Sequence, residues 1–448
     1  MALRKVVILN GTGSADTDLA PALDVLTGVM ELNATEVQTF TLRKLNLGRC
    51  IGCFGCWLET PGICCNAVSE AARAIIDSDI TVLFTPVTFG GYSSELKRMV
   101  DRFIQFALPY FCRYHGETHH VPRYVRFPRL VAVGVQRHSN SDEVKVFKGI
   151  VGRNAINFHA PSHAAEVVLG TDDPSTLRRR LQSLLERVDP LPLGRALRSF
   201  TPAPPPPGAG SAPGGAQRAL FIVGSPKTNS LSASSVLGDW LLNRLKEGGW
   251  ETETLTLKAS LLQETGQAEL CSSVDPADLL VLVFPLYIDA LPFLVTKALE
   301  VIAAHRQGAP AARPQRFAVV CNSGFPEKDE NALALAICHQ FAAQAGMSWY
   351  GSLAVGAGGA LGGQSLTATS RPGMKQVIRA LDLTAAALAE GRPVPQEAVT
   401  MMTRNPVPFI PFATWCWLYG MVGGQRMQRQ AIENGLKKNQ LLARPLTA

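Results

Sequence analysis

The sequence predicts an α/β protein with two doubly wound parallel-sheet domains in tandem and a helical C-terminal tail. Three observations carry this prediction. The chain has 448 residues, which is too long for one hydrophobic core and suits two domains of about 200 residues each. A Pro/Gly-rich segment lies near its middle. Each half begins with a short apolar run that ends in a small, hydroxyl-rich loop, as buried parallel strands do.

The domain boundary is expected at residues 201–216, whose prolines and glycines favour neither a helix nor a β-ladder. This linker separates a first domain at 1–200 from a second domain at 217–400. Residues 401–448 form the tail, where an apolar, aromatic stretch interrupted by prolines precedes several basic residues. Its uninterrupted apolar part, about eleven residues, is too short to span a bilayer. Packing against a domain and peripheral membrane contact both explain such a tail.

The two domains repeat one sequence pattern. An apolar run leads into a loop that begins at Gly11 in the first half and at Gly224 in the second. Later, each half has an aspartate, an apolar strand and a proline, at 79–86 and at 278–285. Strands that alternate with helices predict a parallel sheet, which binds its ligand at the carboxyl ends of the strands. The first half is longer over this stretch by about the size of its cysteine-rich segment.

Composition and charge narrow the function classes. With 46% hydrophobic and 18% charged residues, the chain is expected to fold into globular domains. The net charge of +7 is modest, and no Lys/Arg stripe with interleaved aromatic residues indicates nucleic-acid binding. The first residues run directly into a strand, unlike a signal peptide. We therefore expect a cytoplasmic protein whose clustered cysteines are metal ligands or redox thiols.

The first domain contains a compact group of cysteines. Cys50, Cys53 and Cys56 have the spacing C-x2-C-x2-C, and Cys64 follows after a Pro-Gly turn. Two-residue gaps let successive thiolates converge on one small volume, as they do around an iron–sulfur cluster or a zinc ion. The spacing leaves open a [4Fe-4S] cluster, a zinc ion and metal-free thiols.

Several loops resemble one known family. The loop at 225–232 lies between a strand and a helix, where backbone N–H groups and the helix dipole favour a phosphate. It resembles the phosphate loop of the flavodoxin-like, NADPH-dependent FMN reductase family. Residues 85–91 of the first half are similar to the same family, and the cysteine segment is similar to its iron–sulfur flavoproteins. The resemblance implies two flavodoxin-like domains, FMN as cofactor and NAD(P)H as co-substrate. It also implies a [4Fe-4S] cluster on Cys50, Cys53, Cys56 and Cys64.

The resemblance further implies FMN contacts at the strand ends of both domains, with one or two FMN per chain. In the first domain the candidate residues are Gly11, Thr12, Ser14, Thr17, Pro86, Val87, Thr88, Phe89 and Gly90. In the second domain they are Ser225, Lys227, Thr228, Asn229, Ser230, Ser232, Pro285, Leu286, Tyr287, Ile288, Asp289, Asn322, Ser323 and Gly324. The first phosphate loop departs from the family because it carries Asp16 and Asp18 and no Arg or Lys. A carboxylate near a phosphate is repulsive unless it points away.

We therefore expect an FMN-dependent oxidoreductase that passes electrons between NAD(P)H or ferredoxin and a small-molecule or protein partner. A flavin accepts a hydride as two electrons and releases them singly, and the cluster would relay single electrons. The two halves would form a pseudo-dimer, alone or within a homodimer, in which the cluster serves the flavin of the other half. The alternative is a redox or metal-sensing binding protein with zinc at the cysteines and degenerate flavin sites.

Overall fold

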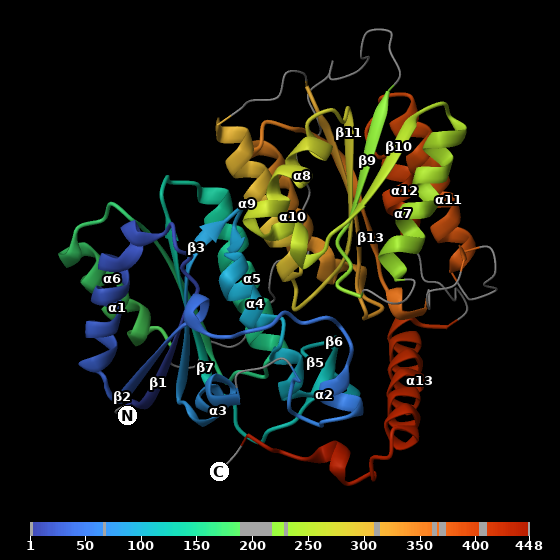
Figure 1. The fold of residues 1–448 in the computed structure, drawn as a ribbon. Coiled ribbons are helices and arrows are strands. Elements are labelled where there is room, and N and C mark those ends of the chain that lie inside the picture. Colours follow the sequence, from blue (N-terminus) through green and yellow to red (C-terminus); the bar gives the residue numbers. More distant parts are fainter. Residues whose placement is uncertain are drawn as a thin grey trace. The chain divides into compact units, whose positions relative to one another are not determined.

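The computed structural model describes residues 3–65, 69–188, 217–227, 232–308, 314–360, 365–366, 373–402 and 410–446 (Figure 1). The chain divides into two compact units. Unit 1 comprises Met1–Leu197 and Trp417–Ala448, and unit 2 comprises Arg198–Cys416. Unit 2 is therefore inserted into the sequence of unit 1, whose last part is the C-terminal tail. The linker predicted at 201–216 lies outside the described residues.

Unit 1 is built on a parallel sheet with the strand order β2-β1-β3-β7-β8. Its strands are β1 (Leu3–Asn10), β2 (Ala34–Thr41), β3 (Ile80–Thr88), β7 (Arg129–Gln136) and β8 (His163–Leu169). Its helices before the tail are α1 (Ala20–Glu31), α2 (Gly55–Leu58), α3 (Ser69–Asp77), α4 (Ser94–Val100), α5 (Ser141–Asn157) and α6 (Pro174–Glu186). Two short pieces are added, β4 (Gly91–Tyr92) beside β3 and the hairpin of β5 (Ala107–Tyr114) and β6 (Glu117–Pro122). Three 3-10 turns are η1 (Thr17–Leu19), η2 (Leu42–Lys44) and η3 (Phe103–Phe106).

The core of unit 1 follows from the apolar runs in the sequence. Ile8 of β1 and Val82 of β3 are fully buried, as expected for central parallel strands with both faces covered. Helices α1 and α6 lie together along the sheet, and α6 contributes Leu181 to the same core (Figure 1). The sequence starts α6 with an aspartate and a proline, and Asp173 accepts hydrogen bonds from the first backbone N–H groups of the helix.

Unit 2 has the strand order β10-β9-β11-β12-β13, again in a parallel sheet. The strands are β9 (Arg218–Val223), β10 (Glu251–Thr256), β11 (Leu279–Pro285), β12 (Arg316–Asn322) and β13 (Ser348–Val355). The helices are α7 (Ala233–Glu247), α8 (Glu264–Val274), α9 (Phe293–Gly308), α10 (Ala332–Gln344), α11 (Met374–Ala389) and α12 (Gln396–Met402). The 3-10 turns are η4 (Ala259–Leu262), η5 (Lys328–Asn331) and η6 (Gly358–Ala360).

The two units repeat one topology. In order along each unit, the strands are arranged 2-1-3-4-5, the doubly wound order in which ligands bind beside the first strand, at the carboxyl edge. The repetition extends to single hydrogen bonds. Asp79 Oδ2 accepts from Lys5 N at 3.0 Å, and Asp278 Oδ2 accepts from Arg218 N at 2.8 Å. Each aspartate thereby ties the start of the third strand to the first. The predicted fold class of two parallel-sheet units is confirmed.

The long helix α13 (Phe412–Glu433) begins within unit 2 and continues into unit 1 from Trp417, and it is followed by η8 (Gln440–Leu442). Aliphatic residues of the tail, not its aromatic ones, pack on the cysteine segment: Met427, Ala431, Leu436 and Leu441. Glycines within α13 allow a close approach to the β5–β6 hairpin. A Cβ at Gly420 would lie 2.9 Å from Phe111 Cβ. Phe412 and Trp417 are exposed. Among the described helices, none combines the length and apolar character needed to cross a membrane.

Glu166 of β8 provides a test of the electrostatics of unit 1. Its carboxylate accepts from Arg180 Nη2 and from Arg187 Nη2, both at 2.6 Å. Burial raises the pKa of Glu166, but the two arginines outweigh it and hold the pKa below its usual value of 4.5. A depressed carboxyl pKa stabilises the fold above the pKa of the unfolded chain. This stabilisation is lost as the pH falls through the folded value.

We therefore expect Glu166→Gln to lower the unfolding free energy by roughly 1–2 kcal/mol at pH 7, because half-buried ion pairs contribute about this much. The difference from the parent chain should shrink once the pH falls below 4.5. Urea unfolding at pH 7 and at more acidic pH measures both quantities. Glu186→Gln, at an exposed position of α6, is the matched control and should be neutral at both. An equal loss at both pH values would contradict the electrostatic explanation.

Candidate functional site

The loops predicted to bind FMN in unit 2 meet at the carboxyl edge of its sheet. Leu286 N donates to the carbonyl oxygen of Asn322 at 2.7 Å, which joins the loop after β11 to the loop after β12. Asn322 Nδ2 donates to Ser234 Oγ at 2.8 Å, in the first turn of α7. Residues more than 80 positions apart in the sequence are thus held at one edge. This is the edge at which doubly wound sheets bind their ligands.

The first of these loops has the build of an anion site. Gly224 N donates to the carbonyl oxygen of Val283 at 2.8 Å, and a Cβ on Gly224 would lie 2.2 Å from Val295 Cγ2. Only a residue without a side chain therefore fits where β9 ends. Ser225 is buried, Lys227 is exposed, and Ser232 caps α7 through a reciprocal pair of bonds with Ser235. The predicted phosphate ligands Thr228, Asn229 and Ser230 lie outside the described residues.

The second loop of unit 2, which follows β11, contains a strained turn, and unit 1 has a similar turn after β3. Ile288 and Asp289 have φ of 48° and 56°, and Tyr287 pairs with Ala290 across the turn. In unit 1, Phe89 and Gly90 have φ of 53° and 82°, between the paired residues of β3 and β4. A positive φ costs a non-glycine residue about 1–3 kcal/mol, and such residues cluster at ligand sites. The recurrence of this turn supports the predicted ligand contacts at 86–90 and 285–289.

The third loop of unit 2 is organised around Ser323. Its hydroxyl donates to the carbonyl oxygen of Phe325 at 3.2 Å and accepts from Asn331 Nδ2 at 3.2 Å. Gly358 N donates to the carbonyl oxygen of Ser323 at 2.7 Å, so the segment after β13 closes on the same loop. A Cβ on Gly324 would meet no described atom within 4 Å. The structure thus places Ser323 as an organiser of the loop and Gly324 beside open space.

In unit 1 a serine that the sequence analysis missed joins the first two loops. Ser93 Oγ donates to the carbonyl oxygen of Gly11 at 2.6 Å, and Ser93 N donates to Thr85 Oγ1 at 3.0 Å. Ser93 also caps α4, and a serine directly before a helix is the sequence signal by which it could have been found. Of the candidate phosphate ligands here, Thr12 is buried, whereas Ser14 and Thr17 are exposed.

The two acidic residues of the first loop are paired with a second missed residue, Arg137, which follows β7. Arg137 Nη2 donates to Asp16 Oδ1 at 2.7 Å and to Asp18 Oδ1 at 3.1 Å, and Arg137 Nε donates to Asp18 Oδ2 at 3.1 Å. The hydrogen bond from Arg137 holds the pKa of Asp18 below its usual value. The carboxylates, mainly Asp16 and then Asp18, raise the pKa of Arg137. Both carboxylates are therefore paired with one cation.

The cysteine segment follows β2 and η2 in the chain and contains the short helix α2. Cys53 Sγ accepts from Gly55 N at 3.3 Å, and Cys64 N donates to Gln105 Oε1 at 3.1 Å. Burial, and then the nearby Asp101, raises the pKa of Cys50 to about 12. Burial and the neighbouring thiols, Cys64 first, raise the pKa of Cys56. The structure therefore brings the four predicted ligands into one neighbourhood, and none of the ten cysteines, all within the described residues, forms a disulfide.

A buried arginine and a buried amide donor lie near two of these thiols. Arg123 is 1% exposed, and its acceptors are the backbone carbonyls of Gln105, Ala107, Leu441 and Ala443. No described residue supplies it with a carboxylate. Burial lowers the pKa of Arg123, while Tyr124, Cys56 and Tyr110 oppose that shift. Gln105 Nε2 is buried and has no hydrogen-bond acceptor among the described residues. A buried cation therefore lies near Cys56, and a spare donor lies on the side chain that binds the backbone of Cys64.

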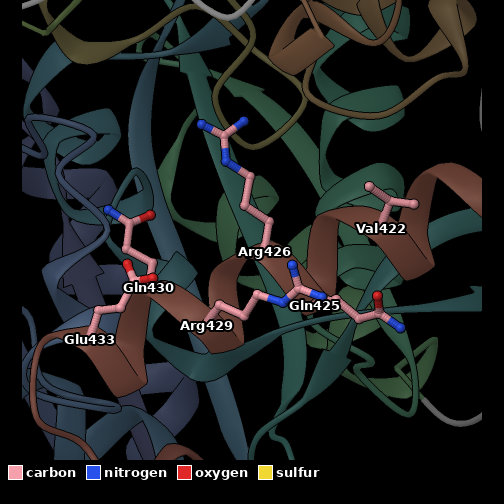
Figure 2. Close-up of a pocket in the computed structure, with 6 residues that line it drawn as sticks. All are labelled: Val422, Gln425, Arg426, Arg429, Gln430 and Glu433. Carbon is pink, nitrogen blue, oxygen red and sulfur yellow. The ribbon is translucent and has the colours of Figure 1, made fainter.

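The described residues, the four cysteines included, contain no group of three His, Cys, Asp or Glu side chains already arranged to hold a metal ion. A cavity of about 540 Å³ is lined by one face of α13, at Val422, Gln425, Arg426, Arg429, Gln430 and Glu433. Figure 2 shows these six side chains along the helix. The cavity contains none of the residues predicted to bind FMN or metal.

Comparisons with known proteins give one family match and several solved structures of low sequence identity. Residues 4–121 match the family model of NADPH-dependent FMN reductase. No curated protein sequence matches the chain. The solved structures include an FMN-dependent NADH-azoreductase from Bacillus anthracis with bound FMN, at 15% identity and a TM-score of 0.30. The match covers 39% of this chain and 99% of the azoreductase. An NAD(P)H:quinone oxidoreductase from Methanothermobacter marburgensis matches at 13% identity and a TM-score of 0.33. That match covers 41% of this chain and all of the other.

The predicted resemblance is confirmed for residues 4–121, which match the family model, and this match supports an oxidoreductase. For unit 2 the same resemblance stays a prediction. The fold assignment itself rests on the strand order and register of the two sheets of this chain.

Proposed function

We propose that the chain is an FMN-dependent NAD(P)H oxidoreductase that holds its flavin at the strand ends of unit 2. The observation that carries the proposal is the strained turn at Ile288 and Asp289, which repeats the turn at Phe89 in the part of the chain that matches the FMN reductase family. Strain retained at equivalent positions of both sheets is typical of ligand contacts. NAD(P)H is the proposed electron donor, and the acceptor is a small molecule or a protein.

The residues of unit 2 have separate tasks in this proposal. Ser225 and the N-terminus of α7 would hold the flavin phosphate, and Lys227 would balance its charge. The turn at 287–290, closed by the backbone hydrogen bonds between Tyr287 and Ala290, would place Tyr287 against the flavin ring. When bound, FMN supplies the redox chemistry, accepting a hydride and releasing single electrons. The three hydrogen-bonded loops fix the position of the ring, and the buried residues at the strand ends exclude water from it.

We further propose that Cys50, Cys53, Cys56 and Cys64 hold a [4Fe-4S] cluster that relays electrons to or from the flavin. The spacing of the cysteines, the buried Arg123 and the unsatisfied Gln105 Nε2 support this assignment. Donors that face cluster sulfur are the groups through which a protein tunes such a centre. Zinc at the same cysteines, with no flavin bound, would instead indicate a metal-sensing protein. The cytoplasmic location, the pseudo-dimer of the two units and a membrane contact of the tail stay predictions.

Cofactor analysis of anaerobically purified protein tests this proposal directly. We expect FMN together with about four iron and four acid-labile sulfide per chain, the composition of one cluster. The NADH- or NADPH-dependent reduction of the bound flavin should follow. A colourless protein with zinc and no flavin would overturn both parts. A yellow protein without iron would overturn the cluster alone.

Substituting one cysteine separates the two cofactors. Cys53→Ala should abolish most bound iron, because a cluster with three ligands is labile, and should leave the FMN content unchanged. Reoxidation of the reduced flavin by one-electron acceptors should slow at least about tenfold, which corresponds to ~1.4 kcal/mol of barrier. Cys65→Ala, next to the proposed ligand Cys64, is the matched control and should keep its iron. Iron loss in the Cys65 variant but not in a Cys64 variant would correct the ligand assignment.

A further inference from the structure

In the first loop of unit 1, a side chain of the loop itself binds a backbone N–H group that would otherwise be available to a phosphate. Gly13 N donates to Asp16 Oδ2 at 2.7 Å, and Thr12 N donates to Asn10 Oδ1 at 3.0 Å. Asp16 stands where a helix cap would stand, yet its carboxylate makes no cap bond to η1 and turns back into the loop. Backbone N–H groups after the first strand are the donors that bind phosphate in doubly wound folds. Two of these donors are already satisfied by side chains of the loop itself.

An independent contact from another strand end fixes this arrangement. Arg137 lies 121 residues from Asp16 in the sequence and bonds both carboxylates of the loop. The guanidinium of Arg137 is therefore bonded to carboxylates of the protein and is not available to a ligand. Two carboxylates and one guanidinium leave the loop with a net negative charge, and residues 11–19 contain no Lys or Arg. A phosphate monoester carries close to two negative charges at neutral pH and would be repelled there.

The corresponding loop of unit 2 has the opposite character. Residues 224–235 contain Lys227 and no acidic residue, and Ser225 is buried at the end of β9. The ring-binding end, in contrast, is kept in both units, since the strained turn occurs at Phe89 as well as at Ile288. The difference between the units is therefore confined to the end of the site that would meet the phosphate.

We infer that Asp16, held in place by Arg137, determines ligand specificity by excluding the flavin phosphate from unit 1. The chain accordingly binds a single FMN, in unit 2. Unit 1 accepts a planar ring without a phosphate group at its strand ends. This inference rests on the proposed function, because it assigns FMN to one of two similar sites.

The number of FMN molecules and their location test the inference. We expect the full chain to contain about one FMN after denaturing extraction, and Ser225→Asp, which introduces the acid of unit 1 into unit 2, to remove it. A parent chain without any FMN would refute the proposed function. About two FMN per chain would refute only this inference. One FMN that survives in the Ser225→Asp variant would refute this inference together with the assignment of the flavin to unit 2, and would leave the oxidoreductase itself in place.

A second experiment measures specificity in unit 1. Asp16→Ser combined with Asp18→Ser frees Arg137 and removes the repulsion. The variant should bind a second FMN, and its preference for FMN over riboflavin should rise at least about tenfold in fluorescence titrations. Asp24→Ser, at an exposed position of α1, is the control and should keep one FMN. Retention of the unit 2 flavin verifies folding. An unchanged preference between FMN and riboflavin would overturn the role of Asp16.

Discussion

Replacing Trp57 by Ala is expected to lower the unfolding free energy of unit 1 by about 3–5 kcal/mol, as for other buried tryptophans. Trp57 is 2% exposed and follows Cys56 directly. Its indole Nε1 lies 2.9 Å from the carbonyl oxygen of Ala107 and 3.2 Å from that of Ile104. The ring also stacks on Phe54 with a centroid separation of 5.2 Å. The cysteine segment, the hairpin and the tail therefore share one small core around this residue.

The contribution of the ring can be separated from that of its hydrogen bonds. Trp57→Phe keeps an aromatic ring and loses the indole donor, so it should cost about 1–2 kcal/mol. Trp417→Ala removes a tryptophan that is 57% exposed and should change the unfolding free energy by less than about 0.5 kcal/mol. Guanidinium unfolding of the full chain, followed by a probe in unit 1, measures all three. A Trp57→Ala variant no less stable than Trp417→Ala would show that these segments do not form one core.

Gly224→Ala is expected to weaken FMN binding by at least about tenfold. It should also destabilise unit 2 by about 1–3 kcal/mol, the usual cost of overpacking. The added methyl group would lie 2.2 Å from Val295 Cγ2 and 3.1 Å from Phe284 Cβ, so β9 and the loop that follows it must move. Because this loop would hold the flavin phosphate, its displacement acts on affinity as well as on stability. Flavin fluorescence titration and thermal unfolding measure the two effects.

Gly238→Ala is the matched control in the same unit. It lies within α7, and a Cβ there would come no closer than 3.5 Å to Val283 Cγ2, which is ordinary contact. Alanine favours a helix interior over glycine by up to about 1 kcal/mol, so this variant should be slightly more stable and bind FMN unchanged. Normal FMN affinity in the Gly224 variant would place the phosphate elsewhere.

The sequence was informative wherever neighbouring residues decide the structure. Apolar runs located the central strands, such as the one containing Ile8, and glycine followed by hydroxyl residues located the phosphate loop after Val223. The strained turn at Ile288 and Asp289 could not be foreseen, because neither residue favours a positive φ and the tertiary structure imposes it.

Two parts of the candidate site depend on residues that are distant in the sequence. The acids of the first loop were visible, but the sequence did not reveal that Arg137, 121 positions from Asp16, forms ion pairs with them. The tail was predicted as a separate C-terminal element, and its contacts with Trp57 depend on a chain reversal that no local pattern encodes. Pairings of this kind are set by the packing of the whole unit.

The cysteine segment is synthesised long before the tail residues that pack on it. Asn434 Nδ2 bonds the carbonyl oxygen of Leu58, 376 residues earlier in the chain. A ribosome adds about 5–20 residues per second, so roughly 20–75 s pass between the synthesis of these two residues. During this interval the four cysteines have been translated, but Leu441, which packs against Cys56 and Trp57, has not. The cysteine segment therefore stays without the part of its packing that the tail supplies until the last residues of the chain are translated.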